Sequence, residues 1–229
     1  MAAQIFSDAN DGFLEVRDNL PPQNPWPVVH PDTFGDFDAQ IGEWFGPGLT
    51  SVVIPFQLPN RGAVVDPFLS ADLGIMVYNI GNDTVTDIDL YGVRVDPDPA
   101  ISVDDFYVGA AFDPSATLIQ ESFLTPSSSA GFVGMPNNNT DATGDANLRD
   151  FLNTSYDGGA GAGQYVFLRL SYGADAFATG FDAYQMTVRE AGLQGEWPVI
   201  TFTVVPEPTG GVLLAACGCL AAAVRRRVR

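Results

Sequence analysis

Residues Gln164–Leu170 read QYVFLRL and form the strongest apolar run of the chain. Because this run is apolar on both faces, it predicts a strand at the centre of a sheet. Short apolar runs recur elsewhere, and Gly, Pro, Asn and Asp separate them at intervals of about 10–15 residues, a spacing typical of an all-β sandwich. The other predicted strands are Ser51–Leu58, Ala71–Ile80, Thr86–Val95, Thr117–Phe123, Tyr184–Arg189 and Pro198–Val205.

The links between these strands carry turn and loop signals. Gly81–Thr84 reads GNDT, a tight-turn sequence that predicts a hairpin between Ala71–Ile80 and Thr86–Val95. The polar stretch Thr125–Thr143 predicts a long loop, and the Pro-rich stretch Asn24–Pro31 predicts an irregular one.

One short helix is expected after the long polar loop. Asp145 or Asn147 can cap a turn or two that runs through Leu148, Phe151 and Leu152. We therefore predict an all-β fold, an antiparallel, jelly-roll-like β-sandwich with one short helix, over residues 1–204.

Composition limits the partners of this domain. The chain has 229 residues, enough for one well-buried domain, and a formal net charge of -18. All ten basic residues are arginine, and four of them lie in the last five positions, so residues 1–224 carry a net charge of -22. Such an acidic body repels phosphate backbones, which excludes nucleic acid as an expected partner.

Cysteine and histidine are scarce, which excludes several chemistries. Cys217 and Cys219 both lie in the apolar C-terminal segment, so the body has no thiol for catalysis, zinc binding or a disulfide. His30 is the only histidine and lies in the Pro-rich stretch, where we expect a solvated side chain. Neither a G-x-S-x-G nor an H-E-x-x-H motif is present.

The C-terminus combines three features in a fixed order. Pro206-Glu207-Pro208 comes first, and residues 209–224 follow without any charge. As a helix, these 16 residues would extend roughly 24 Å, slightly short of a full bilayer crossing. The basic residues after them are expected to hold that end on the cytoplasmic side; they are Arg225, Arg226, Arg227 and Arg229.

This arrangement resembles the PEP-CTERM sorting signal of bacterial proteins, over residues 205–229. The resemblance implies recognition by an exosortase, a single transmembrane helix at residues 209–224, and a body that faces away from the cytoplasm. An ordinary C-terminal membrane anchor is the alternative, but it leaves the Pro-Glu-Pro sequence unexplained. The family also implies a secretory signal peptide, which Met1–Asp8 does not provide, so we expect the true start to lie upstream.

The body carries a second, looser resemblance, at short motifs spread over residues 7–204. It is similar to a body type common in PEP-CTERM proteins and to the DNRLRE-type sandwiches regarded as carbohydrate-binding-like modules. The motifs that carry this resemblance are Phe56-Gln57-Leu58-Pro59, Ser70-Ala71-Asp72-Leu73, Asp89-Leu90-Tyr91-Gly92 and Phe167-Leu168-Arg169-Leu170. A likeness of fold does not identify a ligand.

Besides Asp8, Asp11 and Asp18 near the N-terminus, two loops offer oxygen ligands of the kind that calcium prefers. The candidate ligands are Asp96, Asp98, Asp104 and Asp105 in the first loop, and Asn137, Asn139, Asp141 and Asp145 in the second. The second loop begins like an EF-hand, but Ala142 replaces the turn glycine and Leu148 replaces the bidentate acid. A structural calcium is therefore an alternative to a metal-free body, and no other cofactor is expected.

Three functions follow as hypotheses. The leading one is a non-enzymatic, exported structural or adhesive protein at the cell surface or in extracellular polysaccharide. The second is a carbohydrate-binding module with an aromatic platform chosen from Trp26, Trp44, Trp197, Tyr91, Tyr107 and Tyr172. The third is a glycoside-active enzyme, which no motif favours because 28 acidic residues supply carboxylate pairs by chance. No catalytic residue is assigned.

Overall fold

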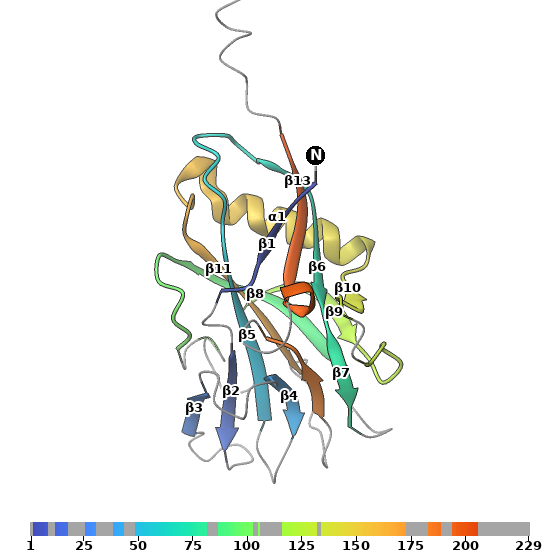
Figure 1. The fold of residues 1–229 in the computed structure, drawn as a ribbon. Helices are drawn as coiled ribbons and strands as arrows, with labels where there is room; N and C mark the ends of the chain where they lie inside the picture. Colours follow the sequence, from blue (N-terminus) through green and yellow to red (C-terminus); the bar gives the residue numbers. More distant parts are fainter. Residues whose placement is uncertain are drawn as a thin grey trace, which may run out of the picture.

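The computed structural model describes residues 2–8, 12–17, 26–30, 39–43, 49–81, 87–102, 105, 116–131, 134–172, 183–188 and 194–205. In these residues the predicted all-β class with one helix is confirmed, because antiparallel strands form two sheets and one α-helix packs beside them (Figure 1). The two sheets share one hydrophobic core, as expected for a β-sandwich.

The smaller sheet has four strands in the order β1-β13-β6-β10. Its strand β13 lies in the interior, with Ala2 of β1 opposite Thr203 on one side and Ser70 of β6 opposite Thr203 on the other. The bounds are β1 Ala2–Phe6, β6 Phe68–Ile75, β10 Asn138–Asn139 and β13 Val199–Val204.

The larger sheet has nine strands, seven of them in the order β7-β12-β4-β5-β11-β8-β9, with β2 and β3 off this path. The QYVFLRL run belongs to β11, which pairs with β5 on one side and β8 on the other, so its predicted central position is confirmed. The bounds are β2 Gly12–Arg17, β3 Trp26–His30, β4 Ala39–Glu43, β5 Leu49–Gln57, β7 Val77–Ile80, β8 Ile88–Asp96, β9 Thr117–Leu124, β11 Tyr165–Tyr172 and β12 Ala183–Met186.

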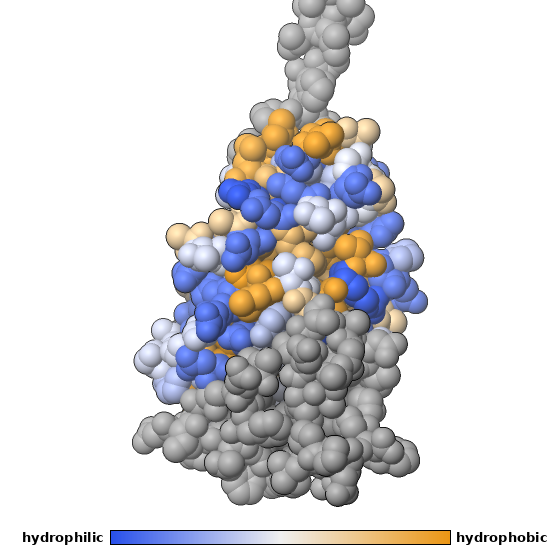
Figure 2. Space-filling view, turned by 180° about the vertical axis from the view of Figure 1, so that it is seen from behind, coloured by the Kyte–Doolittle hydropathy of each residue, from blue (hydrophilic) through white to orange (hydrophobic). Residues whose placement is uncertain are grey.

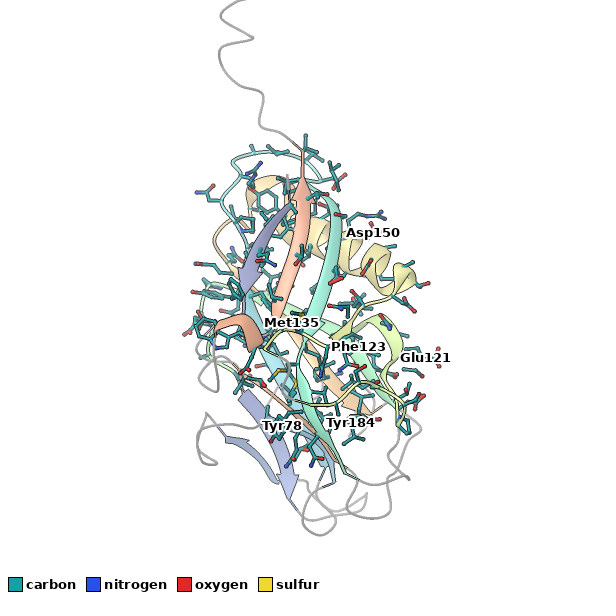
Figure 3. All side chains as sticks on the ribbon, turned by 45° about the vertical axis from the view of Figure 1, so that its right-hand side comes forward. Tyr78, Glu121, Phe123, Met135, Asp150 and Tyr184 are labelled. Atoms are coloured by element: carbon teal, nitrogen blue, oxygen red, sulfur yellow. The ribbon has the colours of Figure 1, made fainter. Side chains whose placement is uncertain are left out.

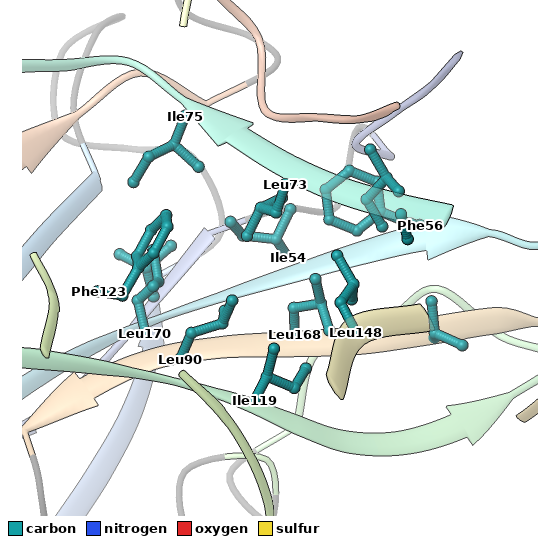
Figure 4. Close-up of a cluster of buried hydrophobic side chains, with 14 of the residues drawn as sticks. Ile54, Phe56, Leu73, Ile75, Leu90, Ile119, Phe123, Leu148, Leu168 and Leu170 are labelled. Carbon is teal, nitrogen blue, oxygen red and sulfur yellow. The ribbon is translucent and has the colours of Figure 1, made fainter. Parts of the chain in front are cut away.

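The core lies between the two sheets. Leu73 of β6 faces Ile54 of β5 and Leu168 of β11, and Leu148 of the helix closes the same cluster (Figure 4). All four side chains are fully buried, and burial of each contributes about 1.5–3 kcal/mol. The opposite face of β11 is buried as well, at Phe167 and Arg169, which explains why the run is apolar on both faces.

The predicted hairpin around Gly81–Thr84 is wrong. Residues Ala71–Ile80 do not form one strand, because β6 ends at Ile75 in the smaller sheet and β7 begins at Val77 in the larger one. β7 then pairs with β12, while β8 pairs with β11 and β9. Met76, which lies between β6 and β7, is as fully buried as Ile75 and Val77 on either side of it. Because successive side chains can all be buried here, the chain can pass from one sheet to the other at Met76.

The predicted helix is present but longer than expected. It is α1, Ala142–Tyr156, and Asp141 caps it rather than Asp145 or Asn147. The Asp141 carboxylate accepts hydrogen bonds from the N–H groups of Thr143 and Gly144, at 2.9 and 2.8 Å. The buried positions recur every four residues over the whole helix, at Gly144, Leu148, Leu152 and Tyr156. Short 3-10 helices lie at Asp157–Gly159 and Gln194–Glu196.

The N-terminal strands were not predicted. Ala2–Phe6 pairs residue by residue with β13 as β1. The Pro-rich stretch was expected to be an irregular loop, but it contains β3, which pairs with β2. β3 contains Pro27, whose backbone nitrogen has no hydrogen to donate, and β2 is the strand beside it in the described part of the sheet.

Candidate functional site

The predicted sorting motif and its arginine cluster lie outside the described residues, as do Asp104, Trp44 and Tyr107. The structure does describe the residue that leads into the motif. Val205 follows the last residue of β13, at the end of the body where β1 and β6 both begin (Figure 1). We refer to this end of the body as the exit end.

Hydrogen bonds hold Val205 in place at the exit end. Its backbone N–H donates to the carbonyl oxygen of Pro67 at 2.9 Å. Its carbonyl oxygen accepts from the guanidinium of Arg61 at 3.3 Å. Because both partners belong to the segment before β6, the last residue before the motif is fixed to the body.

Tyr156, at the end of α1, fixes that same segment. Its hydroxyl accepts from the N–H of Arg61 and donates to the carbonyl oxygen of Gly62, both at 2.8 Å. The ring is fully buried and meets the ring of Phe68 edge-on, with centroids 6.1 Å apart. The Tyr156 hydroxyl thus connects α1 to the segment before β6, and Arg61 connects that segment to Val205. These contacts fix the position of Val205 at the exit end.

In the first candidate calcium loop, an arginine lies between the acids. The Arg94 guanidinium forms an ion pair with Asp105, and a second one with Asp96 at 2.8 Å. It also lies 3.7 Å from the centroid of the Phe167 ring. Asp98 is exposed and accepts the N–H of Ala100 at 3.0 Å. The cation that Asp96 and Asp105 share is therefore a side chain of the protein itself.

Asp105 is the centre of this arrangement. It is fully buried, and its carboxylate accepts two hydrogen bonds from Arg94 and two from Ser102, from the backbone N–H and the hydroxyl. Burial lowers the pKa of Arg94, but the hydrogen bond and charge of Asp105, with the charges of Asp96 and Asp98, outweigh it and raise that pKa overall. The arginine is charged at every ordinary pH, so a cation always lies beside Asp105.

The side chains of the second candidate loop bind the backbone of the body. The amide of Asn137 accepts from the N–H of Val77 at 2.8 Å and donates to its carbonyl oxygen at 2.7 Å, like a rung of the sheet. Asp141 caps α1, and Asp145 accepts from the hydroxyl of Thr140 at 2.6 Å. Asn139 belongs to β10, opposite Gly74.

These contacts bear on metal and membrane binding only for the part of the chain that is described. Within it, no three Asp, Glu, His or Cys side chains gather into a group that could hold a metal ion. In the same residues, no helix has the length and apolar character needed to cross a membrane. Calcium at either loop stays a prediction.

The sequence did not reveal a polar cluster on the far face of the larger sheet. Arg169 is fully buried in the middle of β11 and donates to the backbone carbonyl oxygen of Asp105 at 3.1 Å. Its guanidinium lies 5.1 Å from the centroid of the Tyr91 ring. In the sequence, the only indication of this cluster is Arg169 itself, a charged residue inside the otherwise apolar QYVFLRL run.

Tyr91 belongs to this cluster rather than to an exposed aromatic platform. It is 6% exposed, and its hydroxyl donates to the carboxylate of Asp89 at 2.9 Å. Burial, then the hydrogen bond and charge of Asp89, raise its pKa, although Arg169 lowers it. Asp89 also accepts the backbone N–H of Ser122 at 2.8 Å, so the cluster ties β8 to β9.

Of the other predicted platform residues, the structure describes the surroundings of Trp197. Its ring meets Phe6 edge-on, with centroids 6.1 Å apart, so it closes the end of β1. Trp26 and Tyr172 lie in strands β3 and β11, and their side chains are outside the described part. The described residues therefore do not bring two predicted platform rings together.

Comparison with known proteins adds no family. A scan against protein-family models gives no match to this chain. A search of the curated proteins likewise gives no significant match.

Proposed function

We propose that this chain is an exported structural or adhesive protein of the cell surface or extracellular matrix, sorted by an exosortase through its C-terminal signal. The observation that carries the proposal is the order of Pro206-Glu207-Pro208, the uncharged stretch 209–224 and the arginine cluster. In this account, residues 209–224 form a single transmembrane helix after a jelly-roll-like sandwich, and the exosortase recognises the Pro-Glu-Pro sequence.

The structure of the body supports a structural role over a catalytic one. The acids that the sequence offered as ligands serve the fold: Asp105 binds Arg94, Asp141 caps α1, and Asp145 binds Thr140. A body of residues 1–204 with a net charge of -21 stays soluble outside the cell without relying on disulfides. Extracellular polysaccharide is the surrounding material in which we place it.

The proposal is tested by changing the motif in the native host. In Glu207→Ala and in the double variant Pro206→Ala, Pro208→Ala, we expect the unprocessed chain to accumulate in the membrane fraction. Glu121→Ala is the matched control, because it removes an exposed acid of the body (Figure 3) and should be sorted normally. Normal sorting of both motif variants would contradict the proposal.

A further inference from the structure

Exposed hydrophobic side chains gather at the exit end. Val65 is 72% exposed and Leu69 is 56% exposed, although both are large and apolar. Each lies two residues from Pro67, whose carbonyl oxygen binds Val205. Figure 2 shows hydrophobic residues, with hydrophilic ones between them, at the end of the described body at which β13 ends. Exposed apolar side chains that lie together are a feature of surfaces that bind another protein or a membrane.

The exit end also carries little of the charge that dominates the rest of the body. Residues 2–3, 59–70 and 202–205 meet there, and together they contain one arginine and one aspartate. Asp157 follows Tyr156 at the same end, so the net charge is -1, against -21 for residues 1–204 as a whole. An anionic bilayer therefore repels this end much less than it repels the acidic remainder.

The covalent chain limits how far this end can lie from a bilayer. Val205 is fixed to the body, and Thr209 is the first residue of the uncharged stretch, four positions later. Four residues extend at most about 14 Å, less than the diameter of a small domain. A chain that enters the membrane at Thr209 therefore keeps Val205, and the exit end with it, within about 14 Å of the lipid headgroups.

We propose that, before processing, the exit end rests on the lipid surface, with Val65 and Leu69 in contact with the bilayer. This inference rests on the proposed function, since it requires residues 209–224 to enter the membrane. Beyond the proposed function, the inference assigns an orientation to the body relative to the membrane. The exit end of the sandwich faces the bilayer, and the opposite end of β6 faces away from it.

The orientation can be measured by fluorescence quenching in vesicles of phosphatidylcholine and phosphatidylglycerol. The full chain with Cys217→Ala and Cys219→Ala is the background, and a small fluorophore is attached through Val65→Cys or Leu69→Cys. Met135→Cys is the matched control, because Met135 is 61% exposed and apolar but lies beside the other end of β6. The eight residues of β6 separate the two ends by about 25 Å.

A fourth labelled protein distinguishes this inference from the function on which it rests. It keeps Cys217 as the label site, with Cys219→Ala, and reports entry of the C-terminal segment into the bilayer. We expect deep spin-labelled lipids to quench the label at Cys217, shallow ones to quench those at positions 65 and 69, and neither to quench the one at position 135.

Quenching at Cys217 without quenching at positions 65 and 69 would overturn the orientation and leave the membrane anchor intact. Absence of quenching at all sites would overturn the anchor and the orientation together. Crosslinking between two copies through position 65, without lipid quenching there, would assign the apolar patch to a second chain and also overturn the inference.

Discussion

The backbone N–H of Val205 donates a 2.9 Å hydrogen bond to the carbonyl oxygen of Pro67, so the body holds its own last residue before the Pro-Glu-Pro sequence. Arg61 binds the other side of the same residue, and Tyr156 fixes Arg61 and Gly62. The helix, the segment before β6 and the last strand therefore together support the residue from which the Pro-Glu-Pro sequence continues.

Tyr156→Phe tests this support. The variant keeps the buried ring but leaves the N–H of Arg61 and the carbonyl oxygen of Gly62 without their partner, so we expect the free energy of unfolding to fall by about 1–3 kcal/mol. Urea denaturation measures it. Ser127→Ala, which removes an exposed hydroxyl, should change stability by less than about 0.5 kcal/mol. Equal effects in the two variants would argue against a role for the phenol.

Asp105→Asn tests the ion pair with Arg94. The buried carboxylate loses its charge while the guanidinium keeps its own, and we expect a loss of about 2–3 kcal/mol, less than for a fully buried pair because Arg94 is 28% exposed. Asp98→Asn is the control at the exposed position of the same loop and should be nearly neutral. The melting temperatures of both variants, measured without added metal, show which of them loses stability.

The same pair of variants tests the calcium alternative. Because Arg94 already occupies the space between Asp96 and Asp105 and both oxygens of Asp105 accept hydrogen bonds, we expect added calcium to leave the melting temperature of the protein unchanged. A calcium-dependent rise in the melting temperature that Asp98→Asn abolishes would show that this loop does bind the ion.

Asp141→Ala tests the cap of α1. Two N–H groups of the first turn lose their acceptor, and we expect a loss of about 1 kcal/mol in the free energy of unfolding. Asp150→Ala is the control on the same helix, because its partner Arg149 is an exposed neighbour whose ion pair contributes little. If the two losses were equal, the cap would have no special role.

The sequence predicts the strands that are buried on one or both faces and misses those that are not marked by apolar runs. The QYVFLRL run predicts β11 because core packing repeats along it, and Leu168 and Leu170 are both fully buried. β1 was missed because Ala2–Phe6 is short and largely exposed, and its position depends on pairing with β13 nearly 200 residues later. Such pairing leaves no local signal.

The candidate site shows the same limit. Clustering of acids along the chain indicates possible oxygen ligands, but only the fold shows that Arg94 reaches Asp105 and that Asn137 binds the backbone of Val77. The cap of α1 was misplaced by four residues because Asp145 and Asp141 are both good capping residues. The buried period of four, from Gly144 to Tyr156, would have given the right length.

Stability should depend on pH through Asp72. Burial, followed by the negative charge of Asp145, raises the pKa of its carboxyl above the ordinary value of 3.8. The folded protein then binds this proton more tightly than the unfolded chain, so stability falls as the pH rises from 3.8 through the raised folded pKa.

Asp72→Asn checks this pH dependence. We expect the variant to be more stable than the wild type near neutral pH and to lose that advantage below the unfolded pKa of 3.8. Denaturation across the pH range gives the comparison, with the exposed Asp150→Asn as control. If Asp72→Asn stayed more stable than the wild type by the same amount in acid, the raised pKa of Asp72 would not be the cause.

The central claim is that the C-terminal signal sends this domain out of the cell, and the intact mass of the protein in each fraction of its native host tests it most directly. The account predicts a species at the surface or in the matrix that lacks the residues after the Pro-Glu-Pro sequence. A full-length species that stays in the cytoplasm would contradict it.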